Sequence, residues 1–373
     1  MSFTLYLDRQ QWLKHLTEAD SLFPGYLPVI KGNGYGFGNS FLADAISELG
    51  KRSVAVGTLE EARHIFSTHD FEKILILTPV LSEIRESDLA YVFTVGSFAQ
   101  LEHLFASVEN LSARKLTLPP VKVLLKCRSA MKRYGFAPGD LKEAAEMLRN
   151  HPYFQIQGFS LHFPTERIRE SEKLQQIQTW IEQITTAGLV CDKMYVSHLS
   201  SHLSHRIGEQ HPAVSFIMRL GTGLWLRDKT YYFRSTVLDV RRIIRGERYG
   251  YKQKKTWRNV YLVTVSGGTA NGIGLESPVH ARGLKGRLKL TVFWLLSLFN
   301  LHLSPFIHDG KRLWFAEPPH MQASVLKIRR NPPKPGEEVT LKNLRMTIAT
   351  FDQVVQLHDR ATDSGNKVRQ KQS

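Results

Sequence analysis

Eight short apolar segments recur between residues 27 and 220, and amphipathic stretches separate them. The segments are Leu27–Lys31, Val54–Gly57, Ile74–Leu77, Tyr91–Val95, Val121–Cys127, Ile156–His162, Met194–His198 and Phe216–Leu220. Continuous apolar strands that alternate with amphipathic helices are typical of a parallel sheet whose outer side is covered. The pattern predicts an α/β fold with a (β/α)8 TIM-type barrel over residues 1–228. An open doubly wound sheet is the alternative, although the glycine-rich loop after the first segment lacks the GxGxxG spacing of a dinucleotide site.

Two of the intervening stretches carry signals for the start or end of a helix. Asn39 is suited to cap a helix that Gly50 would end. Thr58 and Glu61 form a capping-box pattern, which predicts the start of the next helix. Such helices would cover the outside of the predicted barrel.

The pattern changes after residue 228. Short segments rich in β-branched and aromatic residues follow one another, joined by turns that contain Gly, Pro or Asn. These segments are 231–234, 237–244, 260–265, 313–315, 325–328 and 338–341. We predict a mostly antiparallel β domain over residues 229–358, followed by a polar, flexible tail over residues 359–373.

One strongly apolar segment, Leu288–Leu301, interrupts this β pattern. Three basic residues precede it: Arg282, Lys285 and Arg287. The segment is too short and too interrupted to span a bilayer, so we predict a packed helix. A basic anchor at a membrane interface is the alternative.

The charge and cysteine content narrow the classes of ligand. The chain has 50 Lys and Arg against 34 Asp and Glu, and the resulting net charge of +16 favours anionic ligands. The basic residues are scattered and form no known nucleic-acid motif, so we expect no nucleic-acid partner. Only Cys127 and Cys191 are present, which excludes a disulfide scaffold and a cysteine-rich metal site, and we expect no metal. The N-terminus has no basic region followed by a long apolar run, which predicts a cytoplasmic protein.

Lys31 ends the first apolar segment and opens a loop with four glycines in its next seven residues. Partial desolvation at the end of a buried strand would lower the pKa of its amine and leave free amine for Schiff-base chemistry. A lysine that reaches solvent ahead of a flexible loop is the alternative interpretation.

Polar side chains also follow four later segments, at the strand ends where barrel enzymes gather their reacting groups. Lys126 lies near the end of the fifth segment, His162 ends the sixth, Ser201 follows the seventh, and Arg219 lies in the eighth. A single residue of this kind is commonly structural. Five strand ends with such residues predict a common site.

The segment Val29–Gly36, with the sequence VIKGNGYG, resembles the pyridoxal-phosphate loop of alanine racemases. The resemblance extends over nearly the whole chain. It implies that Lys31 binds pyridoxal 5'-phosphate covalently and that Tyr35 contacts the phosphate. It also implies that His162, in GFSLHFP, lies beside the cofactor and that Arg219, in MRLGTGLW, donates to the pyridine nitrogen.

The same resemblance implies a phosphate site and a carboxylate site. Ser201 and the backbone amides of Gly221 and Thr222 would contact the phosphate. Arg133, in a stretch similar to TGMxRxGF, would help to position the substrate carboxylate. Lys126 matches a lysine that is often carbamylated in the family and that orients this arginine.

In the second domain, the segment GERYGY resembles the family's GxxVGYG and implies that Tyr251 is the catalytic tyrosine, with Tyr249 as the alternative. In the family this tyrosine comes from the other subunit, so the resemblance implies a homodimer. Lys31 and Tyr251 would exchange the Cα proton on opposite faces of the cofactor. A cationic His162 or Arg219 would favour the phenolate form of the tyrosine. In a motif that corresponds to MDQ, Met321 would contact the substrate.

Several family motifs are altered, chiefly in the second domain. GYADG appears as GTANG, which replaces a tyrosine by Thr269 and an acid by Asn271. Phe351 stands where a late phosphate-contacting tyrosine is expected, and in the barrel Arg128 replaces an aspartate.

We therefore predict a pyridoxal-phosphate-dependent amino-acid racemase that interconverts L- and D-alanine or a related amino acid. The altered motifs favour, as the first alternative, a non-catalytic or low-activity pyridoxal-phosphate-binding homologue. The second alternative is an amino-acid decarboxylase of the related barrel type. Those enzymes use a cysteine from the second domain, and no cysteine follows Cys191.

Overall fold

The computed structural model describes residues 2–113, 118–275 and 283–357 of the chain, which forms two compact units. The barrel unit consists of His15–Gly34 and Asn39–Trp225. The β unit consists of the described part of Met1–Lys14, Tyr35–Gly38 and Leu226–Ser373. The predicted tail, residues 359–373, lies outside the described residues. In the described ranges, no helix has both the length and the apolarity needed to cross a bilayer.

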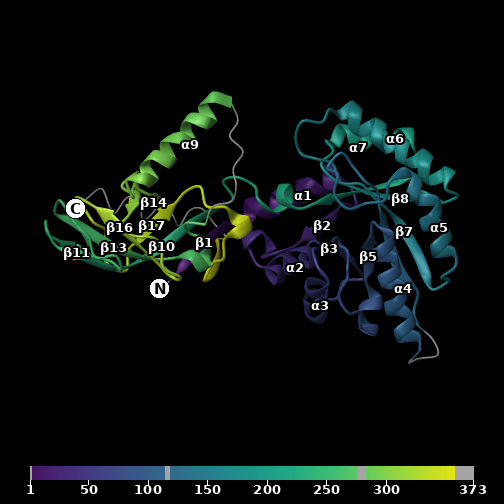
Figure 1. The fold of residues 1–373 in the computed structure, drawn as a ribbon, viewed down its shortest axis with the longest axis horizontal. Coiled ribbons are helices and arrows are strands. Elements are labelled where there is room, and N and C mark those ends of the chain that lie inside the picture. Colours follow the sequence, from purple (N-terminus) through teal and green to yellow (C-terminus); the bar gives the residue numbers. More distant parts are fainter. Residues whose placement is uncertain (1, 114–117, 276–282, 358–373) are drawn as a thin grey trace. The chain divides into compact units, whose positions relative to one another are not determined.

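Eight parallel strands close into a barrel (Figure 1). They are β2 (Leu27–Ile30), β3 (Ser53–Val56), β4 (Lys73–Ile76), β5 (Val92–Val95), β6 (Val121–Lys126), β7 (Phe154–Ser160), β8 (Lys193–Val196) and β9 (Ser215–Leu220). The ring closes where β2 pairs with β9, with Leu27 opposite Arg219. The strands coincide with the eight apolar segments, so the predicted (β/α)8 barrel is confirmed.

Apolar side chains fill the interior of the barrel. One buried cluster joins Leu27, Val29, Ala55, Leu75, Val92, Leu124 and Tyr195. Side chains alternate between the two faces of a strand, so Leu27 and Val29 point to the same face. The other face packs under helices, which explains why the segments are apolar throughout. Each buried leucine or valine contributes about 1.5–3 kcal/mol to folding.

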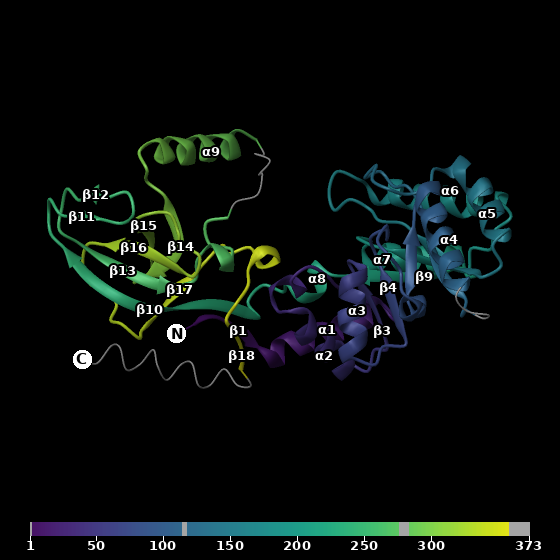
Figure 2. The same ribbon diagram turned by 60° about the horizontal axis from the view of Figure 1, so that its bottom comes forward.

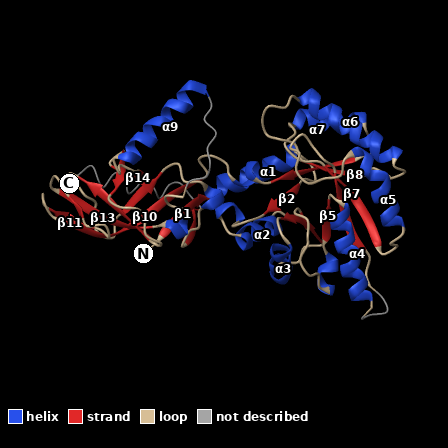
Figure 3. Ribbon diagram, in the orientation of Figure 1, coloured by secondary structure: helices blue, strands red, loops and turns tan. Residues whose placement is uncertain are grey.

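Helices follow the strands of the barrel and cover its outside (Figure 3). They are α1 (Arg9–Leu22), which the β unit shares, α2 (Asn39–Glu48), α3 (Leu59–Thr68), α4 (Phe98–Ser112), α5 (Leu141–Arg149), α6 (Glu170–Thr186), α7 (Ser201–Gln210) and α8 (Thr222–Trp225). The capping box of Thr58 and Glu61 forms at the start of α3, as predicted. Asn39 is the first residue of α2, and its side-chain amide donates to the carbonyl of Gly32 at 3.1 Å. Gly50 adopts φ +69° just beyond the end of α2.

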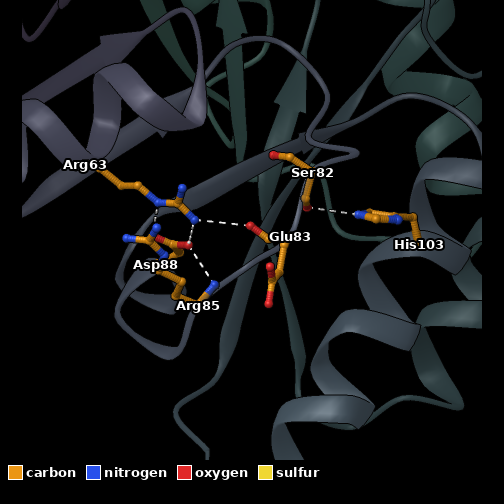
Figure 4. Close-up of polar contacts among 6 residues, drawn as sticks. All are labelled: Arg63, Ser82, Glu83, Arg85, Asp88 and His103. Carbon is orange, nitrogen blue, oxygen red and sulfur yellow. Dashed lines mark hydrogen bonds and ion pairs between the residues drawn. The ribbon is translucent and has the colours of Figure 1, made fainter.

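An ion pair between a partly exposed arginine and a buried aspartate joins α3 to the 3-10 helix η2 (Glu86–Ala90), which precedes β5 (Figure 4). Arg63 of α3 donates through Nη2 to Oδ2 of Asp88 at 2.6 Å and through Nε to Oδ1 at 3.0 Å. The Asp88 side chain is fully buried and also accepts from the amide of Arg85 at 2.8 Å. Removing one partner would leave a buried charge uncompensated at a cost of about 3–5 kcal/mol, so the pair fixes how these elements pack.

The β unit contains an eight-stranded sheet in the order β13-β16-β15-β14-β17-β10-β1-β18, and β13 also pairs with β10. The strands are β1 (Phe3–Asp8), β10 (Tyr231–Ile243), β13 (Val260–Ser266), β14 (Leu303–His308), β15 (Lys311–Phe315), β16 (Ala323–Ile328), β17 (Glu338–Leu341) and β18 (Gln353–Leu357). Only β1 and β18 pair in parallel within this sheet. A separate hairpin joins β11 (Arg248–Tyr249) and β12 (Lys254–Lys255). The predicted mostly antiparallel β domain is confirmed.

The first strand departs from the sequence interpretation, which placed residues 1–228 in one domain. β1 pairs with β10 and β18, so it belongs to the sheet of the β unit. Phe3, Leu5 and Leu7 alternate along β1 and are fully buried. Three alternating residues at a chain end give a weak pattern, and their partners lie more than 200 positions away in the sequence.

The apolar segment Leu288–Leu301 forms a helix, α9 (Gly283–Leu298), that begins earlier than expected. None of the residues of α9 is buried, so the prediction of a packed helix is wrong. Figure 2 shows α9 outside the sheet of the β unit, joined to β14. Its apolar residues occupy more than one face of the helix, and one packed face would not have covered them all.

Candidate active site

The glycine-rich loop at Lys31 is held by one carboxylate. Lys31 follows the end of β2, and Oε1 of Glu61 accepts from the amide of the next residue, Gly32, at 2.6 Å. Oε2 of Glu61 accepts from the amides of Gly57 at 2.7 Å and Thr58 at 3.2 Å. A Cβ at Gly57 would lie 2.7 Å from this carboxylate and 3.1 Å from the Cβ of Lys31. A larger residue at this position would displace the Glu61 carboxylate and with it the hydrogen bonds that hold the loop after Lys31.

The pKa of the Lys31 amine is lowered, which is the direction that the sequence predicted. Partial desolvation, and after it the positive charges of Arg133 and Arg219, lower the pKa of Lys31, while Glu61 acts in the opposite sense. The residue is nevertheless exposed to solvent. A free amine that an incoming ligand can reach is what covalent attachment to an aldehyde requires.

Lys126 ends β6 and is buried, with 7% of its surface exposed. Burial, followed by the charges of Arg219, Arg133 and Lys31, lowers the pKa of Lys126 to about 7. Its Nζ lies 4.1 Å from the centre of the Tyr134 ring. Both neutral and protonated amine are therefore present near neutral pH.

The loop that carries Arg133 returns to the end of β6. The amide of Phe136 donates to the carbonyl of Lys126 at 2.8 Å, and the amide of Arg128 donates to Phe136 at 3.0 Å. Arg133 lies on the exposed part of this loop and acts electrostatically on Lys31, Lys126 and His162.

His162 follows β7 and is a neutral ring. Burial, and then Arg219 and the neighbouring cations, lower the pKa of His162 to about 2. Its Nδ1 lies 2.5 Å from Oγ of Ser197, and its ring centre is 5.1 Å from that of His198. The expectation that a cationic His162 favours a phenolate is therefore wrong, and among the two residues considered only Arg219 carries positive charge.

Arg219 is a second buried cation of the site, with 8% of its surface exposed. Burial lowers the pKa of Arg219 to about 10, so the guanidinium stays charged at neutral pH. Its Nη2 donates to the carbonyl of Leu161 at 3.3 Å. Its Nε is buried without a hydrogen-bond partner in the described structure. A buried charged donor without an acceptor is costly, so this N–H indicates a place for a ligand acceptor.

The remaining residues predicted to bind phosphate begin two helices at the same end of the barrel strands. Ser201 is the first residue of α7, where Oγ of Ser200 accepts from the amide of Leu203 at 3.1 Å. Gly221 and Thr222 follow β9 and open α8. The N-terminus of a helix presents backbone amides to an anion.

Trp225 holds α8 in place, because its indole N–H donates to the carbonyl of Val29 in β2 at 2.7 Å. Tyr35 is buried in a single 3-10 turn, Gly34–Gly36, with φ +53°. The segment Tyr35–Gly38 belongs to the β unit and is described with it.

Taken together, Lys31, Lys126, Arg133 and Arg219 form a cation cluster whose members act electrostatically on one another. Such a cluster favours anionic groups, namely phosphate and carboxylate. Among the described residues, no group of three or more His, Cys, Asp or Glu could hold a metal ion.

Tyr251 and Met321 lie in the β unit, where both line a cavity of about 710 Å³. Tyr251 is in the turn between β11 and β12, and its side chain is exposed. Its backbone amide donates to Oε2 of Glu317 at 3.0 Å, and its ring centre is 5.1 Å from that of His320. His320 and Glu317 are themselves joined at 2.9 Å. These contacts fix the backbone of Tyr251 and leave its phenol accessible.

The alternative tyrosine, Tyr249, is buried. Burial, and after it the negative charge of Glu317, raise the pKa of Tyr249. A buried phenol with a raised pKa rarely loses its proton to form the phenolate that would act as the base, so the geometry favours Tyr251 over Tyr249.

The altered motifs have structural roles in the β unit. Asn271 is buried, its Nδ2 donates to the carbonyl of Thr350 and its Oδ1 accepts from the amide of Gly268, both at 3.1 Å. The ring of Phe351 stacks on Phe3 and on Phe233, with ring centres 5.1 and 5.5 Å away. Thr269 lines the same cavity as Tyr251.

Sequence reasoning did not identify several supporting residues: Glu61, Ser197, His198, Glu317 and His320. Ser197 and His198 lie at the end of the seventh apolar segment, so the strand-end rule already pointed to them. Glu61 was recognised only as part of a capping box. No local pattern marks Glu317, and His320 was recognised only as the first residue of the segment that corresponds to MDQ. Their contacts with Tyr251 depend on the folded sheet.

Comparison with known proteins identifies the family of this chain. The family model described as "Alanine racemase, N-terminal domain" matches residues 8–227. Among curated proteins, the chain is similar to the alanine racemase of Limosilactobacillus fermentum, with 31% identity over 153 residues that make up 40% of each chain. It is also similar to that of Latilactobacillus sakei, with 29% identity over 49% of this chain and 47% of the relative. The chain thus spans less than half the length of these curated relatives.

The fold is shared with solved structures of alanine racemases. The enzyme from Bacillus anthracis with bound L-Ala-P superimposes with a TM-score of 0.68 and 18% identity, over 91% of this chain and 85% of that one. The enzyme from E. faecalis superimposes with a TM-score of 0.63 and 22% identity, over 93% and 91%. These likenesses concern the fold. The family model, however, covers more than half of the sequence, and the chain therefore belongs to the alanine racemase family.

Proposed function

We propose that the protein is a pyridoxal-phosphate-dependent amino-acid racemase that interconverts the L and D forms of alanine or a related amino acid. One observation carries the proposal. The chain has a barrel of the alanine racemase family, and at its mouth lies Lys31, an accessible lysine with a lowered pKa. Part of this lowering comes from the charge of Arg219, which is buried and whose Nε has no hydrogen-bond partner in the described structure. The lysine can form a Schiff base with an aldehyde, and the arginine can donate a hydrogen bond to a ring nitrogen.

The residues present fit pyridoxal phosphate. Lys31 would hold it covalently, and Nε of Arg219 would donate to its pyridine nitrogen. The helix N-termini at Ser201 and at Gly221–Thr222 would hold its phosphate. Bound in this way, the cofactor supplies an electron sink that makes the Cα proton of an amino acid acidic. Arg219 would keep its own proton, because a guanidinium loses one only well above neutral pH.

Racemisation requires that a proton leave one side of Cα and return to the other. Lys31 is the base and acid for one side. Tyr251 is the candidate for the other, with an exposed phenol on a fixed backbone. We propose a homodimer in which Tyr251 acts at the barrel of the second subunit.

Arg133 and Lys126 would bind the substrate carboxylate. Because the pKa of Lys126 falls to about 7, part of its amine is uncharged at neutral pH and able to react with CO2. Carbamylation would place a negative group between the surrounding cations and orient Arg133. The neutral ring of His162 would pack against the cofactor without adding charge.

The first experiment tests cofactor attachment. The purified protein is incubated with pyridoxal phosphate, reduced with borohydride, digested and analysed by mass spectrometry. We expect one reduced adduct, at Lys31. The variant Lys31→Ala should lack it, and the exposed neighbour variant Lys132→Ala should retain it. An adduct spread over surface lysines, or none at Lys31, would contradict the proposal.

The second experiment follows exchange of the Cα hydrogen in D2O with a panel of amino acids, together with chiral separation of the products. Exchange with interconversion of L and D forms supports a racemase. Release of CO2 would show a decarboxylase, and a Lys31 adduct without exchange would show a non-catalytic cofactor-binding protein. Either of these two results would overturn the proposed reaction while leaving the cofactor site intact.

A further inference from the structure

α9 exposes apolar side chains on a helix that no other part of the described chain buries. Its sixteen residues include leucines, valine, phenylalanine and tryptophan but no acidic residue. A helix of this kind in water normally hides one apolar face against its own domain. Large exposed apolar surfaces mark sites of interaction, so we expect α9 to contact another molecule.

One side of α9 faces its own unit. Leu290, Phe293, Trp294 and Ser297 recur at positions i, i+3, i+4 and i+7, so they share one face of the helix. They line a cavity of about 670 Å³ together with residues around β14. None of these side chains is buried, and Trp294 is 62% exposed, but this face of the helix is the one directed toward its own unit.

The opposite side forms a second apolar stripe. Leu284, Leu288, Val292 and Leu295 recur at i, i+4, i+8 and i+11, on the face that points away from the cavity. They are between 45% and 84% exposed. We name these four residues the outer stripe. An apolar stripe on either side explains why a single packed face could not have covered α9.

Cations flank the outer stripe. At 100° per residue, Lys285 and Lys289 lie along one of its edges and Arg287 lies toward the other. No Asp or Glu occurs in α9, and the whole chain has a net charge of +16. Long basic side chains beside an apolar stripe can reach headgroups while the stripe enters the acyl boundary.

From this arrangement we infer that the outer stripe of α9 docks on the surface of an anionic lipid bilayer. The helix lies in the interface and does not cross it, since sixteen residues extend about 24 Å, less than the roughly 30 Å hydrocarbon core. The apolar residues supply burial, and the three cations supply attraction to acidic headgroups.

The charges favour a bilayer over a second copy of the chain. Two copies that met through α9 would bring Lys285, Arg287 and Lys289 toward the same residues of the partner, with no acid on either helix. Like charges at an interface are unfavourable. An acidic lipid surface supplies the opposite charge along the full length of the stripe.

The end of α9 is also suited to an apolar setting. The amides of Phe299 and Leu301 donate to the carbonyl of Leu296, at 3.1 and 2.9 Å, and the amide of Asn300 donates to Ser297 at 2.9 Å. Asn300 adopts φ +53°, as in a left-handed helix end. The carbonyls of Leu296 and Ser297 therefore need no water, which lowers the cost of bringing this end of the helix near the acyl region.

The test is vesicle flotation of the full-length protein. Vesicles of phosphatidylglycerol and phosphatidylcholine are compared with vesicles of phosphatidylcholine alone. We expect binding to the acidic vesicles that weakens as salt is raised. The double variant Leu288→Ser, Leu295→Ser should bind at least about tenfold more weakly, because each leucine loses buried apolar groups. Leu22→Ser with Leu81→Ser is the matched control, since both are exposed leucines of the barrel unit.

Charge is tested separately. Lys285→Gln with Lys289→Gln should weaken binding to acidic vesicles by about fivefold for each cation removed. The exposed Lys142→Gln should leave it unchanged. Equal flotation of the wild type and the Leu288–Leu295 variant would overturn the inference. So would a change in oligomeric mass on sedimentation without a change in vesicle binding, which would identify α9 as a protein interface.

Discussion

The barrel mouth and the cavity of the β unit differ in how closely their residues follow the family. In the barrel, Lys31, Lys126, His162 and Arg219 all stand at or near strand ends and act electrostatically on one another. In the β unit, the cavity beside Tyr251 keeps a tyrosine, but several of the motifs around it are altered.

Geometry explains part of this difference. A closed barrel fixes where each strand ends, so a side chain at that end keeps its place whatever the helices outside become. The β-unit cavity is lined by turns and short connections, and turns accept substitution more readily. The proposed cofactor half is therefore constrained by the fold, whereas the proposed substrate half is free to specialise.

The largest expected effect concerns Tyr251, the β-unit residue that we propose takes part in the chemistry. Tyr251→Phe should reduce Cα-hydrogen exchange by about 10²–10⁴-fold, the usual contribution of a positioned acid–base group. The Lys31 adduct should remain. Tyr249→Phe is the matched control and should retain exchange within a few-fold. If Tyr249→Phe abolished exchange while Tyr251→Phe did not, the assignment of the two tyrosines would be reversed.

The next effect concerns the buried lysine of the barrel mouth. The pKa of Lys126 is about 7 in the folded protein and 10.5 when unperturbed, as in the unfolded chain. Below pH 7 both states are therefore protonated, and the folded state carries the burial penalty. Between pH 7 and 10.5 the unfolded state binds more protons, and stability should rise with pH. Lys126→Met should therefore stabilise the cofactor-free protein at pH 6, by at most about 5 kcal/mol, and much less near pH 10.

Thermal or urea unfolding at the two pH values measures this difference. The exposed Lys132→Met should show no such pH dependence. Equal stabilisation of the Lys126 variant at pH 6 and pH 10 would show that packing, and not the buried charge, sets its stability.

A smaller effect is expected at Arg219. Arg219→Met should weaken pyridoxal-phosphate binding by about 10–100-fold, since one charge-assisted hydrogen bond contributes about 1.5–3 kcal/mol. In the absence of cofactor, the same variant should be as stable as the wild type or more so, because a buried donor without an acceptor is removed. The exposed Arg206→Met should change neither quantity. Loss of stability without loss of affinity would assign Arg219 a purely structural role.

The sequence predicted the barrel because its strands are apolar on both faces and lie next to their neighbours in chain order. The positions of Lys31, Lys126, His162 and Arg219 followed from that regularity. Non-local pairing was not predictable in the same way. β1 joins strands from the far end of the chain, and its short alternation alone gave no indication of them.

The contacts that support the site residues could not be predicted for the same reason. Glu61 accepts hydrogen bonds from Gly32, which lies 29 residues earlier, and only the register of β2 with β3 brings them together. The neutral state of His162 depends on burial and on cations from three other strands or loops. A sequence shows that a histidine is present but not how much water surrounds it.

The smallest expected effect tests whether the altered β-unit motif can simply be reversed. Asn271→Asp restores the acid of the family motif, but Asn271 is buried and its Nδ2 donates to the carbonyl of Thr350. A carboxylate would lose that donor and face the carbonyl oxygen, so we expect a loss of about 1–3 kcal/mol in the free energy of unfolding. Asn343→Asp, at an exposed turn of the same unit, should change stability by less than about 0.5 kcal/mol. An Asn271→Asp protein as stable as the wild type would show that the hydrogen bonds of Asn271 do not determine which residue this turn accepts.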